Sequence, residues 1–257
     1  MKAFKQIIPL SLALASTFVA SGIQADDAHP SVVIVHGAFA DGSDWAKVVP
    51  FLQAEGVEVT VVQNPLTSLA DDVAATERAL NNQQGEVVLV GHSWGGTVIS
   101  EAGQHGKVSA LVYVAAFAPD AGQASGEQGE GFPTPSGISQ LITDSNGYIY
   151  LTPEGMTNDF AQDLPTEQTA VMTATQGPIK ASAFDDRTTV AAWESKPSWY
   201  VLAANDRMIH PELQRAAAKR IGAKLSELPT SHVPQQSRPA EVAEVILEAV
   251  RSVDEQR

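Results

Sequence analysis

Six short apolar runs rich in β-branched residues, separated by stretches with helical periodicity, limit most strongly what this chain can fold into. The first run, Ser31–His36, is continuously apolar at its centre and stops at Gly37, which is typical of a strand covered on both faces. The others lie at Val57–Val62, Glu86–Gly91, Val108–Ala116, Trp199–Ala203 and Lys224–Leu228. This order predicts an α/β fold, in which a mostly parallel, doubly wound sheet of about six strands places its ligand site beyond the carboxyl ends of the strands.

The stretches between these runs carry helix signals. Ser68 with Asp71 three residues later resembles a capping box, and Pro211 occupies a favoured first-turn position of a second helix. Apolar residues recur at helical spacing through residues 242–253, and Pro50 marks the start or a kink of a further helix. We expect these helices to cover both faces of the sheet.

The first 25 residues have the pattern of a secretory signal peptide. Two lysines precede an apolar stretch, Ile7–Ala20, and small residues follow it, so cleavage is expected after Ala25 or alternatively after Gly22. The apolar stretch is short for a membrane anchor and contains Pro9. We therefore expect a secreted or periplasmic protein that has no membrane segment after cleavage.

Charge and the absence of cysteine exclude several functions. The 257 residues include 16 Lys and Arg against 30 Asp and Glu, and the resulting net charge of −14 opposes binding to nucleic acid and to anionic lipid. Without cysteine, the chain has no thiolate nucleophile, cysteine-ligated zinc, iron–sulfur cluster or disulfide. Its chemistry must then come from serine, histidine, carboxylates or a cofactor.

One internal segment, residues 121–188, breaks the alternation of strands and helices. It is rich in Gly and Pro around residues 129–135 and carries only one weak helical stretch, Thr166–Thr175. A structureless connection of this length is uncommon in a compact domain, so we interpret it as a lid over the strand ends. The core domain is then formed by residues 26–120 and 189–257.

The strongest local motif is a nucleophile elbow at Gly91-His92-Ser93-Trp94-Gly95-Gly96. The motif Gly-x-Ser-x-Gly follows a predicted strand and precedes a predicted helix, and small residues beside the serine permit the sharp turn that exposes its hydroxyl. Such strings also arise by chance in glycine-rich loops, but without this strand and helix around them. Ser93 is therefore the predicted nucleophile.

A serine nucleophile needs a base, and three histidines follow the elbow in the chain. His105 falls at the far end of the elbow helix, and His210 falls at the start of the Pro211 helix. His232 follows the last predicted strand, at the same edge of the sheet as Ser93. In this architecture the chain order is serine, acid, histidine, so His232 is the predicted base.

The base in turn needs a carboxylate to orient it. Asp206 follows the run at 198–204 and precedes His232, which makes it the leading candidate. Asp120 lies one strand earlier and is the alternative, because some proteins of this architecture place their acid there. Asp206 could otherwise be an ordinary helix-capping or surface residue.

The loop after the first strand, His36–Ser43, is expected to lie beside the elbow and to supply part of an oxyanion hole. The predicted donors are the main-chain N–H groups of Ala38 and Trp94. His36 precedes the elbow in the chain, so we interpret it as fixing the loop by hydrogen bonds rather than as the base.

The ordered set of motifs resembles the α/β-hydrolase superfamily. Within it, the chain is similar to the small lid-bearing group that contains plant methylesterases, hydroxynitrile lyases and related bacterial esterases. The resemblance spans most of the mature chain and rests on His36-Gly37-Ala38, Trp45, Gly91-His92-Ser93-Trp94-Gly95-Gly96, Val114–Asp120, Asp206 and Ser231-His232-Val233-Pro234. It implies an α/β-hydrolase fold with Ser93 as nucleophile, Asp206 as acid, His232 as base, and Ala38 and Trp94 as oxyanion donors.

Some positions depart from the pattern of this group. Trp94 is bulkier than the residue usual after the nucleophile and would narrow the pocket, and Gln235-Gln236 stand where apolar residues are more usual. The hydroxynitrile lyases place Lys after the catalytic histidine, where this chain has Val233, and Thr in the oxyanion loop, where it has Gly37-Ala38. The resemblance therefore favours hydrolysis over lyase activity.

The sequence thus predicts a serine hydrolase that cleaves a small carboxylic ester, such as a methyl ester or lactone, without metal or cofactor. Phe39 and Phe117 are the predicted lining of an apolar substrate pocket, although aromatic residues near the elbow could equally belong to the core. Two alternatives stay open: a cofactor-independent lyase or dioxygenase on the same scaffold, and a non-catalytic binding protein. The sequence leaves the natural substrate and the oligomeric state undetermined.

Overall fold

The computed structural model describes residues 29–257. The predicted signal peptide, residues 1–25, lies outside the described residues, so its cleavage and the export that it implies stay predictions. No helix within 29–257 combines the length and the apolar character needed to span a bilayer.

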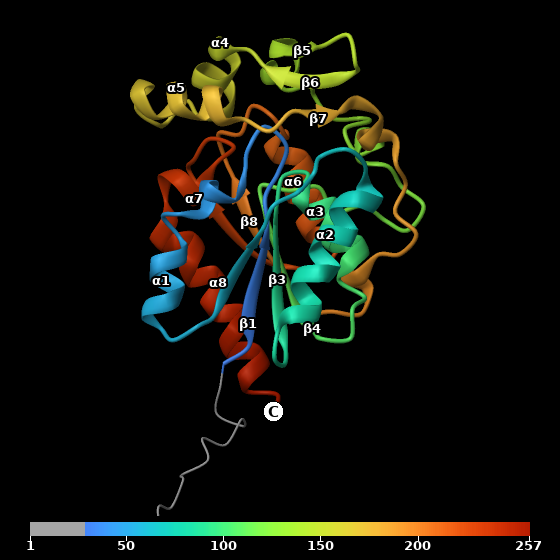
Figure 1. The fold of residues 1–257 in the computed structure, drawn as a ribbon, viewed down its shortest axis with the longest axis vertical. Helices are drawn as coiled ribbons and strands as arrows, with labels where there is room; N and C mark the ends of the chain where they lie inside the picture. Colours follow the sequence, from blue (N-terminus) through green and yellow to red (C-terminus); the bar gives the residue numbers. More distant parts are fainter. Residues whose placement is uncertain (1–28) are drawn as a thin grey trace, which may run out of the picture.

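A six-stranded sheet forms the centre of the molecule (Figure 1). Its strands run in the order β2-β1-β3-β4-β8-β9, and every neighbouring pair is parallel. The α/β-hydrolase fold and the parallel sheet predicted from the sequence are confirmed. The bounds of the strands are β1 Ser31–Val35, β2 Val59–Val62, β3 Val87–His92, β4 Val108–Val114, β8 Ser198–Ala203 and β9 Lys224–Leu228.

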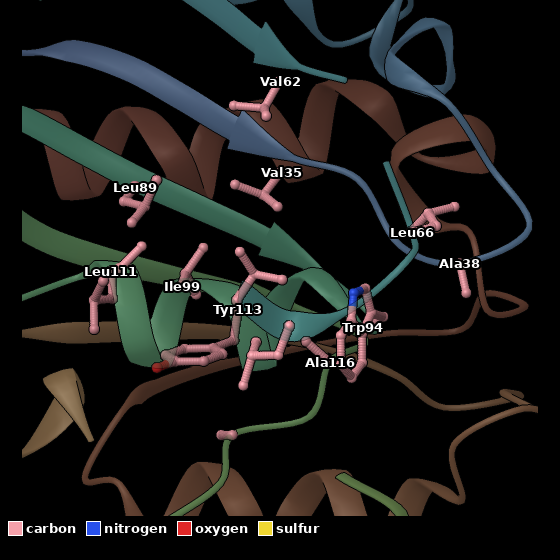
Figure 2. Packing of buried hydrophobic residues seen from close by; sticks show 14 of the residues in the cluster. Val35, Ala38, Val62, Leu66, Leu89, Trp94, Ile99, Leu111, Tyr113 and Ala116 are labelled. Carbon is pink, nitrogen blue, oxygen red and sulfur yellow. The ribbon is translucent and has the colours of Figure 1, made fainter. Parts of the chain in front are cut away.

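Alternate residues of the central strands point to opposite faces of the sheet, and each face has its own apolar core. Val32 and Ile34 of β1 pack in a cluster with apolar residues of α1 and α8. Val33 and Val35 join a second cluster on the other face, with α2, α3 and α6. Figure 2 shows part of this second cluster at the carboxyl ends of β1 and β3. The bounds are α1 Val49–Ala54, α2 Leu69–Asn82, α3 Gly95–Ala102, α6 Pro211–Arg220 and α8 Pro239–Asp254.

Local sequence signals account for where several helices begin. The Ser68 hydroxyl accepts a hydrogen bond from the Asp71 N–H at the start of α2, which satisfies one of the free donors of the first turn. Pro50 is the second residue of α1 and Pro211 is the first of α6, positions where the missing N–H costs little. A short helix, α7 Pro234–Ser237, follows the His232 loop.

Residues 121–188 form the most irregular part of the described chain. Three short strands build a separate antiparallel sheet in the order β5-β6-β7, which lies with α4 and α5 beyond one end of the central sheet (Figure 1). The weak helical stretch predicted at Thr166–Thr175 is α5. The bounds are η3 Ser125–Glu127, η4 Ser136–Gln140, β5 Leu141–Thr143, β6 Tyr148–Leu151, α4 Pro153–Gly155, the π-helical turn η5 Met156–Phe160, α5 Thr166–Thr175, β7 Ile179–Lys180 and η6 Ala181–Asp185.

Candidate active site

The turn between β3 and α3 brings Ser93 to the carboxyl end of the sheet. Ser93 has a φ of 53°, in the left-handed region that non-glycine residues seldom adopt. Close packing around it leaves no room for side chains on the flanking glycines. A Cβ on Gly91 would come within 2.5 Å of the Gly95 carbonyl oxygen, and a Cβ on Gly96 would overlap the Phe117 carbonyl oxygen. The motif therefore uses glycine where the strand and the helix approach most closely.

The structure brings Ser93, His232 and Asp206 together in one hydrogen-bonded chain. His232 Nε2 lies 2.9 Å from Ser93 Oγ, and His232 Nδ1 lies 2.7 Å from Asp206 Oδ2. All three residues are buried. A carboxylate only accepts, so it selects the tautomer that carries the proton on Nδ1 and leaves Nε2 free to accept the serine proton.

Asp206 is held by more than its contact with His232. It lies between β8 and α6, and its Oδ1 accepts hydrogen bonds from the N–H groups of Met208, at 2.7 Å, and Ile209, at 3.0 Å. Gln214 Nε2 of α6 donates to Oδ2 at 2.6 Å. These donors fix the plane of the carboxylate and compensate for its burial.

His92, the residue before Ser93, supports the His232 loop from inside the core. Its Nε2–H donates to the main-chain oxygen of His232 at 2.8 Å, and the two rings lie 4.8 Å apart. Burial holds the pKa of His92 well below its ordinary value, so the ring is neutral and does not compete as a base. This role of His92 could not be predicted from the sequence, where its place inside the elbow motif is the only signal.

The pair Gln235-Gln236 packs through hydrogen bonds rather than through apolar contacts. Both side-chain amides donate to the carboxylate of Asp44, at 2.5 Å from Gln235 and 2.9 Å from Gln236. Burial raises the pKa of Asp44, and these hydrogen bonds oppose that rise. The polar pair therefore anchors the chain directly after His232. Asp44 was missed from the sequence, because its partners are about 190 positions away.

Both predicted oxyanion donors belong to residues next to Ser93: Trp94 follows it in the chain, and Ala38 lines the same small cavity. Within residues 29–257, neither the Ala38 N–H nor the Trp94 N–H donates a hydrogen bond to another protein group. His36 has the structural role expected for it. Its Nε2 accepts from the Asn64 N–H at 2.9 Å, and its Nδ1 lies 2.8 Å from the Gly37 oxygen. Burial lowers the pKa of His36, as suits a neutral histidine that fixes a loop.

The alternative acid and the other two histidines lie in other surroundings. The Asp120 side chain is half exposed and forms an ion pair with Arg220 rather than a contact with His232. His105 lies 3.2 Å from the side-chain oxygen of Asn81, and His210 caps α6. Neither histidine contacts Ser93.

A small cavity at Ser93 adjoins a larger one. The smaller, of about 60 Å³, is lined by Ser93, His232, Ala38 and both predicted aromatic residues, Phe39 and Phe117. The larger, of about 300 Å³, has no Asp, Glu, Lys or Arg among the described residues that line it. The two cavities share six lining residues: Phe117, Ile138, Leu141, Phe184, Met208 and Ile209.

The expectation that the large Trp94 side chain narrows the substrate pocket is wrong. This side chain is fully buried in the core cluster beneath the turn rather than among the residues that line either cavity. Among residues 29–257, no group of three or more His, Asp or Glu side chains is arranged to hold a metal ion.

A serine on a strand–turn–helix elbow, joined to a histidine and a carboxylate from later loops of a parallel sheet, defines the α/β-hydrolase class of protein. A model of the alpha/beta hydrolase family matches residues 32–245, and the chain belongs to this family.

Known proteins agree with this assignment. The pyrethroid hydrolase of Sphingobium wenxiniae is 27% identical over 249 residues, which cover 84% of this chain and 85% of that protein. Methylesterase 2 of Arabidopsis thaliana is 26% identical over 246 residues, which cover 84% and 94%. The crystal structure of a pyrethroid hydrolase from Sphingobium faniae JZ-2 has a TM-score of 0.75 at 23% identity, covers 88% of this chain and 99% of its own, and shares the fold.

Proposed function

We propose that the protein is a serine esterase that cleaves carboxylic esters through an acyl-enzyme. The observation that carries this proposal is the hydrogen-bonded chain from Ser93 Oγ to His232 Nε2, at 2.9 Å, and from His232 Nδ1 to Asp206 Oδ2, at 2.7 Å. A serine hydroxyl is a weak nucleophile until a base within hydrogen-bond reach takes its proton. The names of the relatives, a pyrethroid hydrolase and a methylesterase, agree with ester cleavage.

In the proposed reaction, Ser93 Oγ attacks the ester carbonyl while His232 takes its proton. The N–H groups of Ala38 and Trp94 stabilise the oxyanion, and His232 then gives the proton to the departing alcohol. His232 next removes a proton from water, which attacks the acyl carbon and releases the acid. Asp206 holds the tautomer of His232 and stabilises the positive charge on its ring. No step calls for a metal or organic cofactor.

The substrate that we propose is an uncharged small-molecule ester, with methyl esters and lactones among the candidates. The absence of charged side chains from the described lining of the 300 Å³ cavity supports this choice, because a charged substrate group would lose its hydration there without a partner. We also propose that residues 121–188 act as a lid, since Ile138, Leu141 and Phe184 of this segment line both cavities.

The experiment that tests the proposal compares wild type with Ser93→Ala on chromogenic esters of graded acyl length. The expected result is a fall in kcat of about 10⁴-fold or more, because the acyl-enzyme can no longer form. Ser195→Ala is the matched control, since its hydroxyl donates only to the Ala192 oxygen, and it should retain wild-type turnover. Ester turnover that survives Ser93→Ala would contradict the proposal and favour chemistry without an acyl-enzyme.

A further inference from the structure

The side chain of Trp94 forms a buried hydrogen bond that the proposed reaction does not use. The indole Nε1–H donates to Asp72 Oδ2 at 2.7 Å, and both side chains lie out of solvent. Asp72 belongs to the first turn of α2, where acidic residues are common at the surface. A buried carboxylate is costly unless its partners are in place, so this contact demands a defined geometry from both residues.

The second oxygen of Asp72 fixes a neighbouring loop. Its Oδ1 accepts a hydrogen bond from the Leu66 N–H at 2.8 Å, and Leu66 has a φ of 58°, a conformation that a leucine adopts only when its surroundings impose it. The Leu66 oxygen in turn accepts from the N–H of Lys180 at the end of β7, at 2.8 Å. The Asp72 carboxylate therefore joins the elbow to the loop after β2, and the Leu66 oxygen joins this loop to the end of β7.

The indole of Trp94 is fixed from a second direction. The Phe184 ring meets it edge to face with centroids 5.3 Å apart, and Phe184 lines the cavity beside Ser93. Figure 2 shows the Trp94 ring at the same end of the core cluster as Leu66 and Ala38. Two rotatable bonds separate the indole from the Trp94 main chain. Because Asp72 and Phe184 both hold the indole ring, they also restrain the direction of the main-chain N–H of Trp94.

We propose that Asp72 is a positioning residue for the oxyanion hole. By holding the indole of Trp94, Asp72 directs the main-chain N–H of Trp94 toward the oxyanion. This inference rests on the proposed esterase function. Asp72 touches no substrate atom and acts only through Trp94. A correctly directed donor stabilises the transition state, in which negative charge develops on the carbonyl oxygen. A misdirected donor stabilises the transition state less, while binding of the ground state is retained.

The test uses Asp72→Asn and Trp94→Phe in the full chain, with Asp71→Asn as the matched control. Asp71 is the exposed neighbour whose oxygen accepts from Thr67 and Ser68, so its variant should behave as wild type. Each of the other two variants should lower kcat about 10- to 100-fold and leave KM within about threefold, a smaller loss than removal of a whole oxyanion donor. The double variant should lose no more than the more damaged single variant, because both changes break one interaction.

A second readout separates this role from simple core stabilisation. An aryl trifluoromethyl ketone is attacked by Ser93 Oγ and becomes a hemiketal oxyanion bound to Ser93, with the serine proton on His232, whereas the corresponding alcohol binds without that charge. The affinity of Asp72→Asn and Trp94→Phe for the ketone should fall in parallel with kcat, while affinity for the alcohol is retained. A structural role alone would weaken both ligands together or neither.

Three outcomes decide the matter. Wild-type kcat and ketone affinity in both folded variants would overturn the proposal, and so would an equal loss of ketone and alcohol binding. If Asp72→Asn does not fold, Trp94→Phe still decides, since it keeps an aromatic ring against Phe184. Retained turnover in Ser93→Ala would instead overturn the esterase function itself, which is a different and distinguishable failure.

Discussion

The carboxyl edge of the central sheet and residues 121–188 meet at the same cavities but are built differently. At the sheet edge, Ser93, Asp206 and His232 follow parallel strands, and hydrogen bonds join their buried side chains in one chain. Residues 121–188 supply short antiparallel strands and half-exposed apolar side chains such as Ile138. In the proposed reaction, the sheet edge therefore positions the reacting side chains, while the irregular segment shapes the cavities around them.

The largest effect that this comparison predicts is on the acid at the sheet edge. Asp206→Asn should lower kcat about 10⁴-fold, because an amide favours the wrong tautomer of His232. Steady-state kinetics on one chromogenic ester measures the loss, and a thermal melt checks that the variant is folded. Asp120→Asn is the control for the alternative acid and should stay within about threefold of wild type. If Asp206→Asn is as active as wild type, the proposed role of the Asp206 carboxylate in orienting His232 is wrong.

A second prediction sets one glycine of the elbow against one of residues 121–188. Gly96→Ala should lower the free energy of unfolding by about 3 kcal/mol, because the new methyl group would overlap the Phe117 carbonyl oxygen. Gly129→Ala should change it by less than about 0.5 kcal/mol, since no atom lies within 4 Å of the added group. Urea denaturation gives both values. Equal losses in the two variants would mean that the two regions are packed alike.

A third prediction concerns the effect of pH on stability through the buried carboxylate of Asp72. Burial, with a smaller contribution from nearby Asp71, raises the pKa of Asp72 to about 6, although the hydrogen bonds from Trp94 and Leu66 oppose the rise. A carboxyl whose pKa is raised on folding binds its proton more tightly in the folded state. The contribution of Asp72 to the free energy of unfolding therefore falls as pH rises from about 4 to about 6, and it does not fall further above that range.

Comparison with Asp72→Asn isolates this contribution from that of the other carboxylates. The wild type should lose on the order of 2 kcal/mol relative to Asp72→Asn between pH 4 and pH 7. Urea denaturation at a series of pH values measures the difference. A difference that is constant with pH, or that grows in favour of wild type, would contradict a raised pKa.

The smallest predicted effect is on selectivity, at the segment above the cavities. Ile138→Ala should lower kcat/KM for esters with long apolar acyl chains about fivefold relative to acetates, because Ile138 lines both cavities. Ile142→Ala is the matched control, since Ile142 is exposed in β5 and lines neither cavity. A change of kcat alone, equal for all acyl lengths, would contradict the division of roles between the two regions.

The sequence predicted the sheet edge well because its signals are local. Each strand is a continuous apolar run, and Gly91-x-Ser93-x-Gly95 carries its own geometry in five residues. Strand order then placed Asp206 and His232 at the same edge, although 139 positions separate His232 from Ser93.

Other features could not be predicted, because no local pattern encodes them. The strands of residues 121–188 are two to four residues long, too short to show a period of two, and only α5 was anticipated there. Asp72 resembles any acidic residue in the first turn of a helix, and only the folded chain brings it to Trp94. The same holds for Asp44 and the pair Gln235-Gln236.

The central claim is that Ser93 is a nucleophile made reactive by His232, and covalent labelling by a fluorophosphonate tests it most directly. Trypsin releases Ser93 in the peptide 79–107, which also holds Ser100, so fragment-ion mass spectrometry must locate the adduct. We predict one phosphonyl group per wild-type chain, on Ser93, with none on Ser93→Ala and labelling slowed at least about 10³-fold in His232→Ala. An adduct on another residue, or ester turnover by a protein that never becomes labelled, would contradict the account.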